Sequence, residues 1–470
     1  MAIPISSAAQ MREWEAATWA SGQTEAEVIR RVGARVAARA VQLTQADDFI
    51  LLLAGKGHNG DDVRAAVSGL AGRRVQLLEV ISPSEQFSPL EAALNQKPAL
   101  VVDGLFGIGL NRPLDTGWVQ FITRINAANL PVLAVDVPSG LNADTGEVFG
   151  AAVQAAVTLT VGAPKSGMLR QGAWPYVGRL EVAGDVGLLP CPHTAEWLWT
   201  MPEDFTGFPP PRPVAGHKGT FGHLAIIAGS VGYHGAAVLA TRGAQRAQPG
   251  LVTVLPLEPA YYQVAGQLQS AMVKAWSSEV HFPDNYSALL VGPGLAARDV
   301  PEELIVSVRK LWRDSLLPMV VDASALDWLP MDHVPKSAVR VVTPHPGEAG
   351  RLIKATTAQV QADRPHAVRE ISKRFGHCWV VLKGHQTLIG RSSGEIFVNP
   401  SGNPYLAQGG SGDVLAGFIA GLLAQSAAGP GVLRTLRYAV WQHGAAADGL
   451  QAARRNWMVE ELVREIGNVR

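Results

Sequence analysis

The segment "FILLLAG" at residues 49–55 decides the fold that we expect for the first half of this chain. It is apolar without interruption rather than in alternation, which is typical of a strand buried on both faces of a parallel sheet. A glycine-rich turn and a helix-length stretch follow it. Runs of the same kind recur at residues 74–80, 99–107, 131–140 and 156–165. The first half therefore predicts a parallel sheet between two layers of helices.

The second half repeats this rhythm, beginning with "HLAIIAG" at residues 223–229. Further apolar runs follow at residues 250–255, 288–294, 318–326, 340–348 and 378–384. Between the halves lies "MPEDFTGFPPPRPVAG" (201–216), whose proline density disfavours regular structure and marks a linker. We predict an α/β protein of two three-layer αβα domains, residues 1–205 and 206–470.

Composition excludes several classes of function. The chain has 470 residues, with 40 basic and 40 acidic side chains, so no broad basic field for nucleic acid is expected. Cys191 and Cys378 lie far apart without CxxC spacing, which argues against a disulfide framework or a thiolate zinc site. The sequence shows neither a signal-peptide pattern nor an apolar run of membrane-spanning length. We expect a cytoplasmic protein with no membrane and no nucleic-acid partner.

The segment "LAQGGSGDVLAG" (406–417) is the first candidate site, because ligands of open α/β sheets bind outside the carboxyl ends of the strands. Gly409, Gly410 and Gly412 can present backbone amides to an anion, and Asp413 stands at the start of the helix that follows. Taken alone, the stretch is equally compatible with an ordinary helix start at which Asp413 only caps the dipole.

Three other strand ends carry candidates, each with a structural alternative. Lys383 and Thr387 in "LKGHQT" suit a phosphate or adenosine contact, or belong to a simple hairpin turn. His345 and Glu348 in "VTPHPGE" suit a ligand contact, or are a surface imidazole and a first-turn partner of the helix dipole. Ala236 belongs to a helix-length stretch after the first strand of this half. Its small side chain suits either contact with a ligand or close packing of the helix.

The order of these motifs carries more information than any one of them. Read as HKGTFG, VGPGL, VVDASAL, TPHPGE, LKGHQT and GGSGDVLAG, the second half resembles the ADP/ATP-dependent NAD(P)H-hydrate dehydratase family, of ribokinase-like fold, over about residues 210–465. Related kinases of vitamin precursors generally have TPNxxE, whereas this chain has His345. Ser324 in "DASAL" departs from the family, which often has an acid there.

This resemblance implies repair of hydrated nicotinamide cofactor, in which ADP and Mg²⁺ serve the dehydration of the S hydrate and AMP and phosphate are released. Asp413 would act as the general base, and the Gly409 to Gly412 amides would stabilise charge on the transferred phosphoryl group. The resemblance places the adenine nucleotide on Lys383, Gly384, His385, Gln386, Thr387 and Gly412. It places the hydrate on Ala236, Gly294, His345 and Asp413.

The first half resembles the NAD(P)H-hydrate epimerases, of Rossmann-like fold, over about residues 5–200. The resemblance rests on "LAGKGHNGDDVRAA" (53–66), "VVDGLFGIGLNRPL" (101–114), "VDVPSGLNADTG" (135–146) and "VGAPKSG" (161–167). The first motif is normally GxGNNGGDG. We expect the extra carboxylate of Asp61 to repel an anion, and Val63 to resist the positive φ that a glycine would adopt.

The epimerase resemblance implies a K⁺ site made by Asn59, Asp103 and Ser139, whose oxygen atoms suit a hard cation. Epimerisation needs an acid and a base, and Asp136 and Lys165 are the candidates, unless Lys165 is only a surface charge at a strand end. The hydrate would contact His58, Asn59, Gly60, Asp61, Asp62, Gly107, Ile108, Gly109, Leu110, Asn111, Arg112, Pro113 and Asp136.

The sequence thus predicts a bifunctional repair enzyme, epimerase first and dehydratase second, acting on NADHX and NADPHX and forming a homo-oligomer. The alternative is a ribokinase-like kinase of a vitamin precursor with a non-catalytic module that binds a nucleotide or a partner. The altered residues at 58–63 favour this alternative for the first half, and the presence of Asp103, Asp136 and Ser139 opposes it.

Overall fold

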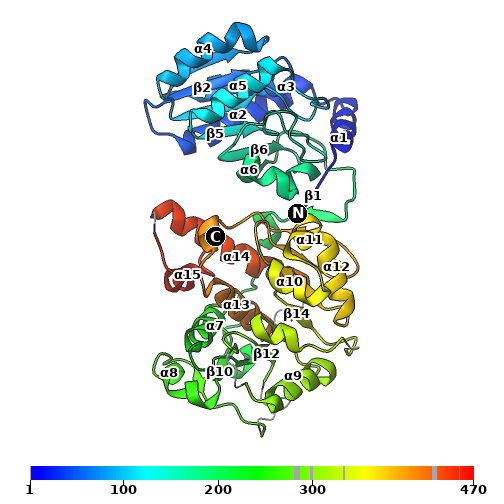
Figure 1. The fold of residues 1–470 in the computed structure, drawn as a ribbon, viewed down its shortest axis with the longest axis vertical. Coiled ribbons are helices and arrows are strands. Elements are labelled where there is room, and N and C mark those ends of the chain that lie inside the picture. Colours follow the sequence, from blue (N-terminus) through cyan, green and yellow to red (C-terminus); the bar gives the residue numbers. More distant parts are fainter. Residues whose placement is uncertain are drawn as a thin grey trace. The chain divides into compact units, whose positions relative to one another are not determined.

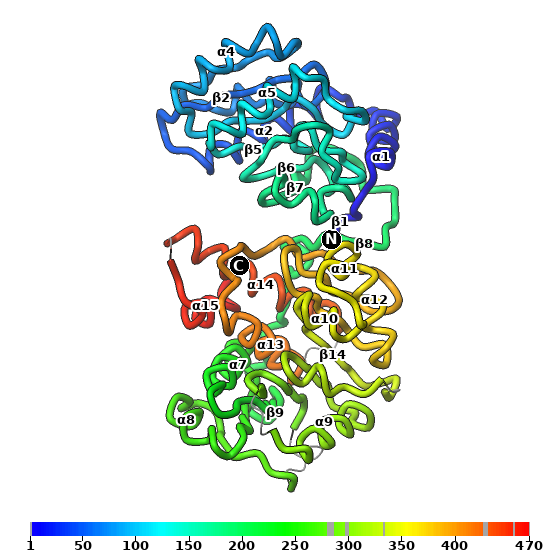
Figure 2. The backbone as a smooth tube through the Cα atoms, viewed as in Figure 1, coloured from blue at the N-terminus to red at the C-terminus, as the bar shows by residue number. Residues whose placement is uncertain are grey.

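The chain folds as two compact units, Ile3–Trp199 and Thr200–Arg470, in a computed structural model (Figures 1 and 2). The structure describes residues 2–279, 286–296, 300–331, 334–425, 431–454 and 456–469. Both units are α/β with mainly parallel sheets, which confirms the predicted fold class. Among the described residues, no helix combines the length and the apolar character that crossing a membrane requires.

The N-terminal unit is built on a parallel sheet with the strand order β3-β2-β4-β5-β6-β7. Its strands are β2 (Phe49–Ala54), β3 (Arg74–Glu79), β4 (Leu100–Gly104), β5 (Val132–Val135), β6 (Val157–Val161) and β7 (Arg179–Ala183). Its helices are α1 (Ala8–Ala20), α2 (Glu25–Leu43), α3 (His58–Ala66), α4 (Pro83–Asn95), α5 (Thr116–Ala127) and α6 (Trp174–Val177). The short strands β1 (Ile3–Pro4) and β8 (Trp197–Trp199) pair with each other in an antiparallel sense.

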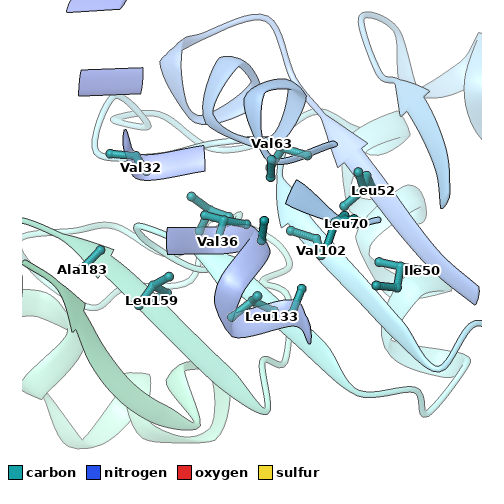
Figure 3. Packing of buried hydrophobic residues seen from close by; sticks show 14 of the residues in the cluster. Val32, Val36, Ile50, Leu52, Val63, Leu70, Val102, Leu133, Leu159 and Ala183 are labelled. Atoms are coloured by element: carbon teal, nitrogen blue, oxygen red, sulfur yellow. The ribbon is translucent and has the colours of Figure 1, made fainter. Parts of the chain in front are cut away.

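Strand β2 explains why its sequence is apolar throughout. Its alternate side chains point to opposite faces of the sheet, and every residue of the strand is buried. Ile50 and Leu52 pack with Val32 and Val36 of α2 on one face (Figure 3). Leu51 and its neighbour Leu53 pack on the other face, against side chains of α4 and α5. Two apolar layers thus require an unbroken apolar strand.

The C-terminal unit has the strand order β17-β16-β15-β14-β13-β12-β9-β10-β11, parallel except at β16 and β17, which return as antiparallel strands. Its strands are β9 (His223–Ile227), β10 (Leu251–Leu255), β11 (Met272–Val273), β12 (Ala288–Val291), β13 (Met319–Val321), β14 (Arg340–Val342), β15 (Trp379–Leu382), β16 (Leu388–Gly390) and β17 (Ile396–Val398). Its helices are α7 (His234–Arg246), α8 (Tyr261–Ala265), α9 (Glu302–Asp314), α10 (Pro346–Ile353), α11 (Thr357–Ala362), α12 (Arg364–Arg374), α13 (Ser411–Leu423), α14 (Val432–Ala453) and α15 (Val459–Glu465).

The beginning of the proline-rich stretch belongs to the C-terminal unit rather than to a free linker. Phe205 is buried, with its ring centroid 5.6 Å from that of Tyr438 and 5.4 Å from that of Trp441. Asp204 forms an ion pair with Arg437 of α14. These contacts explain why the compact unit begins at Thr200, before the expected boundary at 205.

Helices α7 and α13 approach each other so closely that glycine is required at their contact. A Cβ atom on Gly417 would lie 1.9 Å from the carbonyl oxygen of Ala240. A Cβ atom on Gly243 would lie 2.3 Å from the carbonyl oxygen of Val414. This backbone contact fixes the position of α13, and with it the start of the glycine-rich segment.

We predict that Gly417→Ala destabilises the protein by about 2 kcal/mol or more, because the added methyl group meets a backbone carbonyl that cannot rotate away. Gly449→Ala is the matched control, since the space around Gly449 in α14 is open. This control is expected to be neutral or stabilising by up to about 1 kcal/mol, as alanine favours a helix. Urea denaturation followed by tryptophan fluorescence measures both effects. Equal stability of the two variants would contradict the packing described here.

Candidate active sites

The carboxyl ends of three neighbouring parallel strands bring polar side chains together in the C-terminal unit. Asp322 follows β13, Thr343 follows β14 and Lys383 follows β15. The Lys383 Nζ donates to Asp322 Oδ1 at 2.6 Å, and the Thr343 hydroxyl donates to the same oxygen at 2.7 Å. Asp322 was not a predicted site residue, although its place directly after an apolar strand was a usable signal.

Helix α10 begins with a capping box that confirms the structural role considered for Glu348. Its carboxylate accepts a hydrogen bond from the backbone amide of His345 at 2.7 Å, and His345 Nδ1 accepts one from Gly347 at 3.0 Å. The same carboxylate lies 3.8 Å from the Nζ of Lys383. Glu348 therefore both caps the helix and contributes negative charge to the lysine site.

Asp413 lies in the first turn of α13, which begins at Ser411 after Gly410 at a φ of 95°. A Cβ atom on Gly412 would lie 3.5 Å from the Lys383 Nζ, so the lysine is close to this turn. Apart from Gly409 and its two neighbours in the chain, no described residue has an atom within 4 Å of the Cβ position of Gly409, so that side of the loop is open. The helix start thus offers backbone amides beside a partly buried cation, as an anion site requires.

Burial and the neighbouring charges set the protonation of this cluster. Burial, aided by the charges of Asp322 and Glu348, raises the pKa of Asp413 to about 7, and the Lys383 cation acts in the opposite direction. Burial alone would lower the pKa of Lys383, but the surrounding carboxylates more than offset this and raise it. Lys383 stays a cation while Asp413 can gain or lose a proton near neutral pH.

The segment from Lys383 to Thr387 connects β15 and β16 as a hairpin, which was the alternative considered for it. A buried guanidinium, that of Arg364, holds its shape by donating to the carbonyl oxygens of Leu382 and Gln386, each at 3.2 Å, and of His385. Arg364 was not predicted, because nothing in the sequence ties this helical arginine to the hairpin.

Ala236 and Gly294 lie side by side at the same edge of the sheet. A Cβ atom on Gly294 would lie 3.0 Å from that of Ala236 and 2.4 Å from the carbonyl oxygen of Tyr233. Beneath the glycine-rich segment, the buried His443 of α14 has its Nε2 2.9 Å from the carbonyl oxygen of Ser411. Burial lowers the pKa of His443 to about 4, so this imidazole is neutral at pH 7.

The N-terminal unit contains a cavity of about 680 Å³ at the carboxyl ends of β2, β4 and β5. Its lining includes nine of the predicted hydrate contacts, namely His58, Asn59, Asp62, Gly107, Ile108, Gly109, Leu110, Arg112 and Asp136. The other four predicted contacts, Gly60, Asp61, Asn111 and Pro113, are not among its described lining residues. Helix α1 adds Arg12 and Glu15, which no sequence motif pointed to.

Lys165 is buried in the wall of this cavity, so the interpretation as a surface charge is wrong. Its ammonium group donates to Asp136 and, at 2.9 Å each, to the hydroxyl of Thr160 and the carbonyl oxygen of Val161. Asp136 has a φ of 63°, an uncommon conformation for a residue other than glycine. The pair is a buried ion pair held at a constrained backbone position.

Asn59, Asp103 and Ser139 meet around the backbone of Phe106. Ser139 donates to Asp103 through its hydroxyl at 2.6 Å and its amide at 2.9 Å, and its hydroxyl accepts from the Phe106 amide at 2.9 Å. Asn59 donates to the Phe106 carbonyl at 2.8 Å, and its own Oδ1 is buried without a donor among the described residues. Burial raises the pKa of the Asp103 carboxyl. An oxygen without a partner beside a buried carboxyl group fits a hard monovalent cation.

The altered loop at 58–63 differs from the sequence expectation at Val63. This residue lies inside helix α3 and is not among the described residues with positive φ, so that expectation is wrong. Asp61 pairs with Arg64 at 2.8 Å, but Arg64 also pairs with Glu79, so two carboxylates share one cation. Burial and the charges of Asp136 and Asp61 raise the pKa of Asp62 to about 8. The effect of the extra acid on a bound anion stays a prediction.

These two sites define an α/β enzyme with two active centres, each at the carboxyl edge of its own parallel sheet. Residues 224–467 match the profile of the NAD(P)H-hydrate dehydratase family, and residues 73–167 match that of the YjeF-related protein N-terminus. The bifunctional NAD(P)H-hydrate repair enzyme Nnr of Gloeobacter violaceus is 35% identical to this chain, over 96% of the chain and 94% of that protein. The chain belongs to the family of bifunctional NAD(P)H-hydrate repair enzymes.

Three further proteins are similar to this chain over all or part of its length. The Escherichia coli Nnr is 33% identical, over 86% of this chain and 81% of that protein. A ribokinase-like superfamily protein from Enterococcus faecalis superimposes with a TM-score of 0.52 at 24% identity, over 59% of this chain and 96% of its own, which confirms the ribokinase-like fold. The ADP/ATP-dependent NAD(P)H-hydrate dehydratase of Bacillus subtilis is 29% identical, over 55% of this chain and 92% of its own, with a TM-score of 0.49.

We predict that the dehydratase rate at saturating substrate falls as the pH drops through about 7, because the general base that the family resemblance assigns to Asp413 works only when it is ionised. Lys383→Gln removes the cation that lowers the Asp413 pKa, so the acid limb of the pH profile should move to higher pH. The exposed Lys310→Gln is the control and should leave the limb in place. If the acid limb of Lys383→Gln lies at the same pH as that of the wild type, Asp413 is not the group whose ionisation sets the limb.

Proposed function

We propose that the C-terminal unit dehydrates the S forms of NADHX and NADPHX with ADP as phosphoryl donor, releasing AMP and phosphate. The observation that carries this proposal is the Asp413 carboxyl group, which lies partly buried near Lys383 in the first turn of a helix that begins with a glycine-rich segment. Hydroxide is a poor leaving group, so transfer of a phosphoryl group to the hydroxyl makes elimination feasible. Asp413 would accept the hydroxyl proton, while the amides of Gly409 to Gly412 would stabilise the transferred group.

The ligands would occupy the two sides of this helix start. The adenine nucleotide would contact Gly412 and the hairpin from Lys383 to Thr387, whose shape Arg364 holds. The hydrate would contact Ala236, Gly294, His345 and Asp413. Mg²⁺ usually binds through substrate phosphates and one or two carboxylates, and it would reduce the negative charge of the nucleotide here.

For the N-terminal unit we propose epimerisation of the hydrates at the hydroxylated ring carbon. The C–O bond must break and re-form on the opposite face of the ring, which needs an acid and a base. Asp136 would exchange the proton, and Lys165 would orient its carboxylate through their ion pair. Asn59, Asp103 and Ser139 would hold K⁺, as the Asn59 oxygen without a donor supports.

We also propose that the enzyme acts in a reducing cytoplasm and has no nucleic-acid partner. The balance of acidic and basic residues and the two free cysteines support this. A homo-oligomer is the expected assembly, and size-exclusion chromatography with light scattering measures it directly.

Asp413→Asn is expected to lower the dehydratase rate by about 10²- to 10⁴-fold, the usual contribution of a general base, while ADP still binds. The assay measures NAD(P)H, AMP and inorganic phosphate together, and each should form in equal amounts. Accumulation of a stable phosphorylated product instead would support the kinase alternative.

Asp103→Asn is expected to abolish the dependence of epimerase activity on K⁺, because the buried carboxylate would no longer balance the cation. Asp185→Asn, an exposed residue of the same unit, is the control. The dehydratase activity of each variant shows independently whether the protein is folded. If the wild-type enzyme epimerises the hydrate at the same rate when tetramethylammonium replaces K⁺, the proposed K⁺ site is contradicted.

A further inference from the structure

A second cavity, of about 690 Å³, lies in the C-terminal unit away from the dehydratase site. It is lined by the last turns of α7, by residues 249–252 at the start of β10, by residues 269–272 and by Arg212 of the proline-rich stretch. Ala236 and Arg246 stand ten residues apart in α7, so they are separated by roughly 15 Å along the helix axis. The cavity is therefore at the amino ends of the strands, opposite the catalytic edge.

Three arginines line this cavity, Arg212, Arg242 and Arg246, and its described lining residues include neither Asp nor Glu. In the part of the chain that the structure describes, none of the three forms an ion pair with a carboxylate. Three like charges around one cavity repel each other unless an anion offsets them. The C-terminal dipole of α7 favours the two arginines of its last turns, but it does not account for Arg212, which comes from another segment.

The guanidinium groups are held in place by neutral partners. Arg246 donates to the carbonyl oxygens of Arg464 at 2.7 Å and Ile466 at 3.2 Å. Arg242 donates to the carbonyl oxygen of Gln267 at 3.2 Å. These bonds use only some of the five N–H donors of each guanidinium, so the remaining donors stay available.

Arg212 completes this set of donors. Its guanidinium carbon lies 4.1 Å from the ring centroid of Phe221, and it donates to the side chain of Gln425 at 3.0 Å. The cavity thus has three arginines held in place and no carboxylate among its described lining residues, which calls for an anionic ligand.

We propose that this cavity binds a small anion with one or more phosphate groups, at a site separate from the dehydratase centre. Guanidinium groups bind phosphate oxygens through paired N–H donors, and several arginines held in place favour a multiply charged phosphate over a single carboxylate. The volume falls within the range of ordinary ligand sites, about 300–1,000 Å³.

The test is calorimetric titration of the full chain with inorganic pyrophosphate at about 0.15 M salt, where weak surface binding is screened. Arg212→Gln/Arg242→Gln should weaken this binding at least 10-fold and leave the ADP-dependent dehydratase rate unchanged. Arg246 is kept, because it supports the segment after α15. Arg309→Gln is the matched control, since Arg309 also donates to a carbonyl oxygen but lies outside the cavity. Its affinity for pyrophosphate should equal that of the wild type.

Two results would overturn the proposal. If the wild-type protein does not bind pyrophosphate, the arginines serve only to hold the backbone. If the double variant binds it as tightly as the wild type, the anion occupies another site, such as the glycine-rich segment of the dehydratase centre. A dehydratase rate equal to that of the wild type would show that the double variant is folded. Weaker binding of pyrophosphate by this variant would then not reflect loss of structure.

Discussion

Both units of this enzyme depend on one constraint, which is that a parallel strand covered by helices on both faces favours apolar side chains along its length. Strand β2 is buried along its whole length, and its alternate residues enter two separate apolar layers. Charged side chains then gather where such strands end, and the carboxyl ends of parallel strands share one edge. Asp322 and Lys383 meet in the C-terminal unit for this reason, as do Asp103 and Ser139 in the N-terminal unit.

A lysine paired with a buried or nearly buried carboxylate recurs at both edges, and the two pairs have different consequences. Lys165 is enclosed by acceptors and holds Asp136 as a charged partner. Lys383 contacts Asp322 and lies near Glu348, so the cluster around it carries an excess of negative charge. Burial, together with that excess, raises the pKa of Asp413 to about 7, which is close to the optimum for the general base that we propose it to be.

Much of this could be predicted from the sequence, because unbroken apolar runs and the order of strand-end motifs indicate parallel sheets and a repair enzyme. The remainder depends on contacts between distant residues. Nothing local shows that Arg364 supports the hairpin after β15, or that Lys165 is buried. The error at Val63 has a different origin. A motif position usually held by glycine was taken to need a positive φ, whereas here the residue lies within α3 and packs in the core.

The most direct test of the central claim, that one chain carries two cooperating centres, starts from the purified R hydrate alone. With ADP, Mg²⁺ and K⁺ present, the enzyme should restore the reduced-nicotinamide absorbance near 340 nm completely, and faster than the hydrate epimerises unaided. Asp136→Asn should reduce recovery to the unaided rate while still consuming the S hydrate at the normal rate. Recovery from the R hydrate that is no faster with the wild-type enzyme than with Asp136→Asn would contradict the account, because the N-terminal unit would then not be an epimerase.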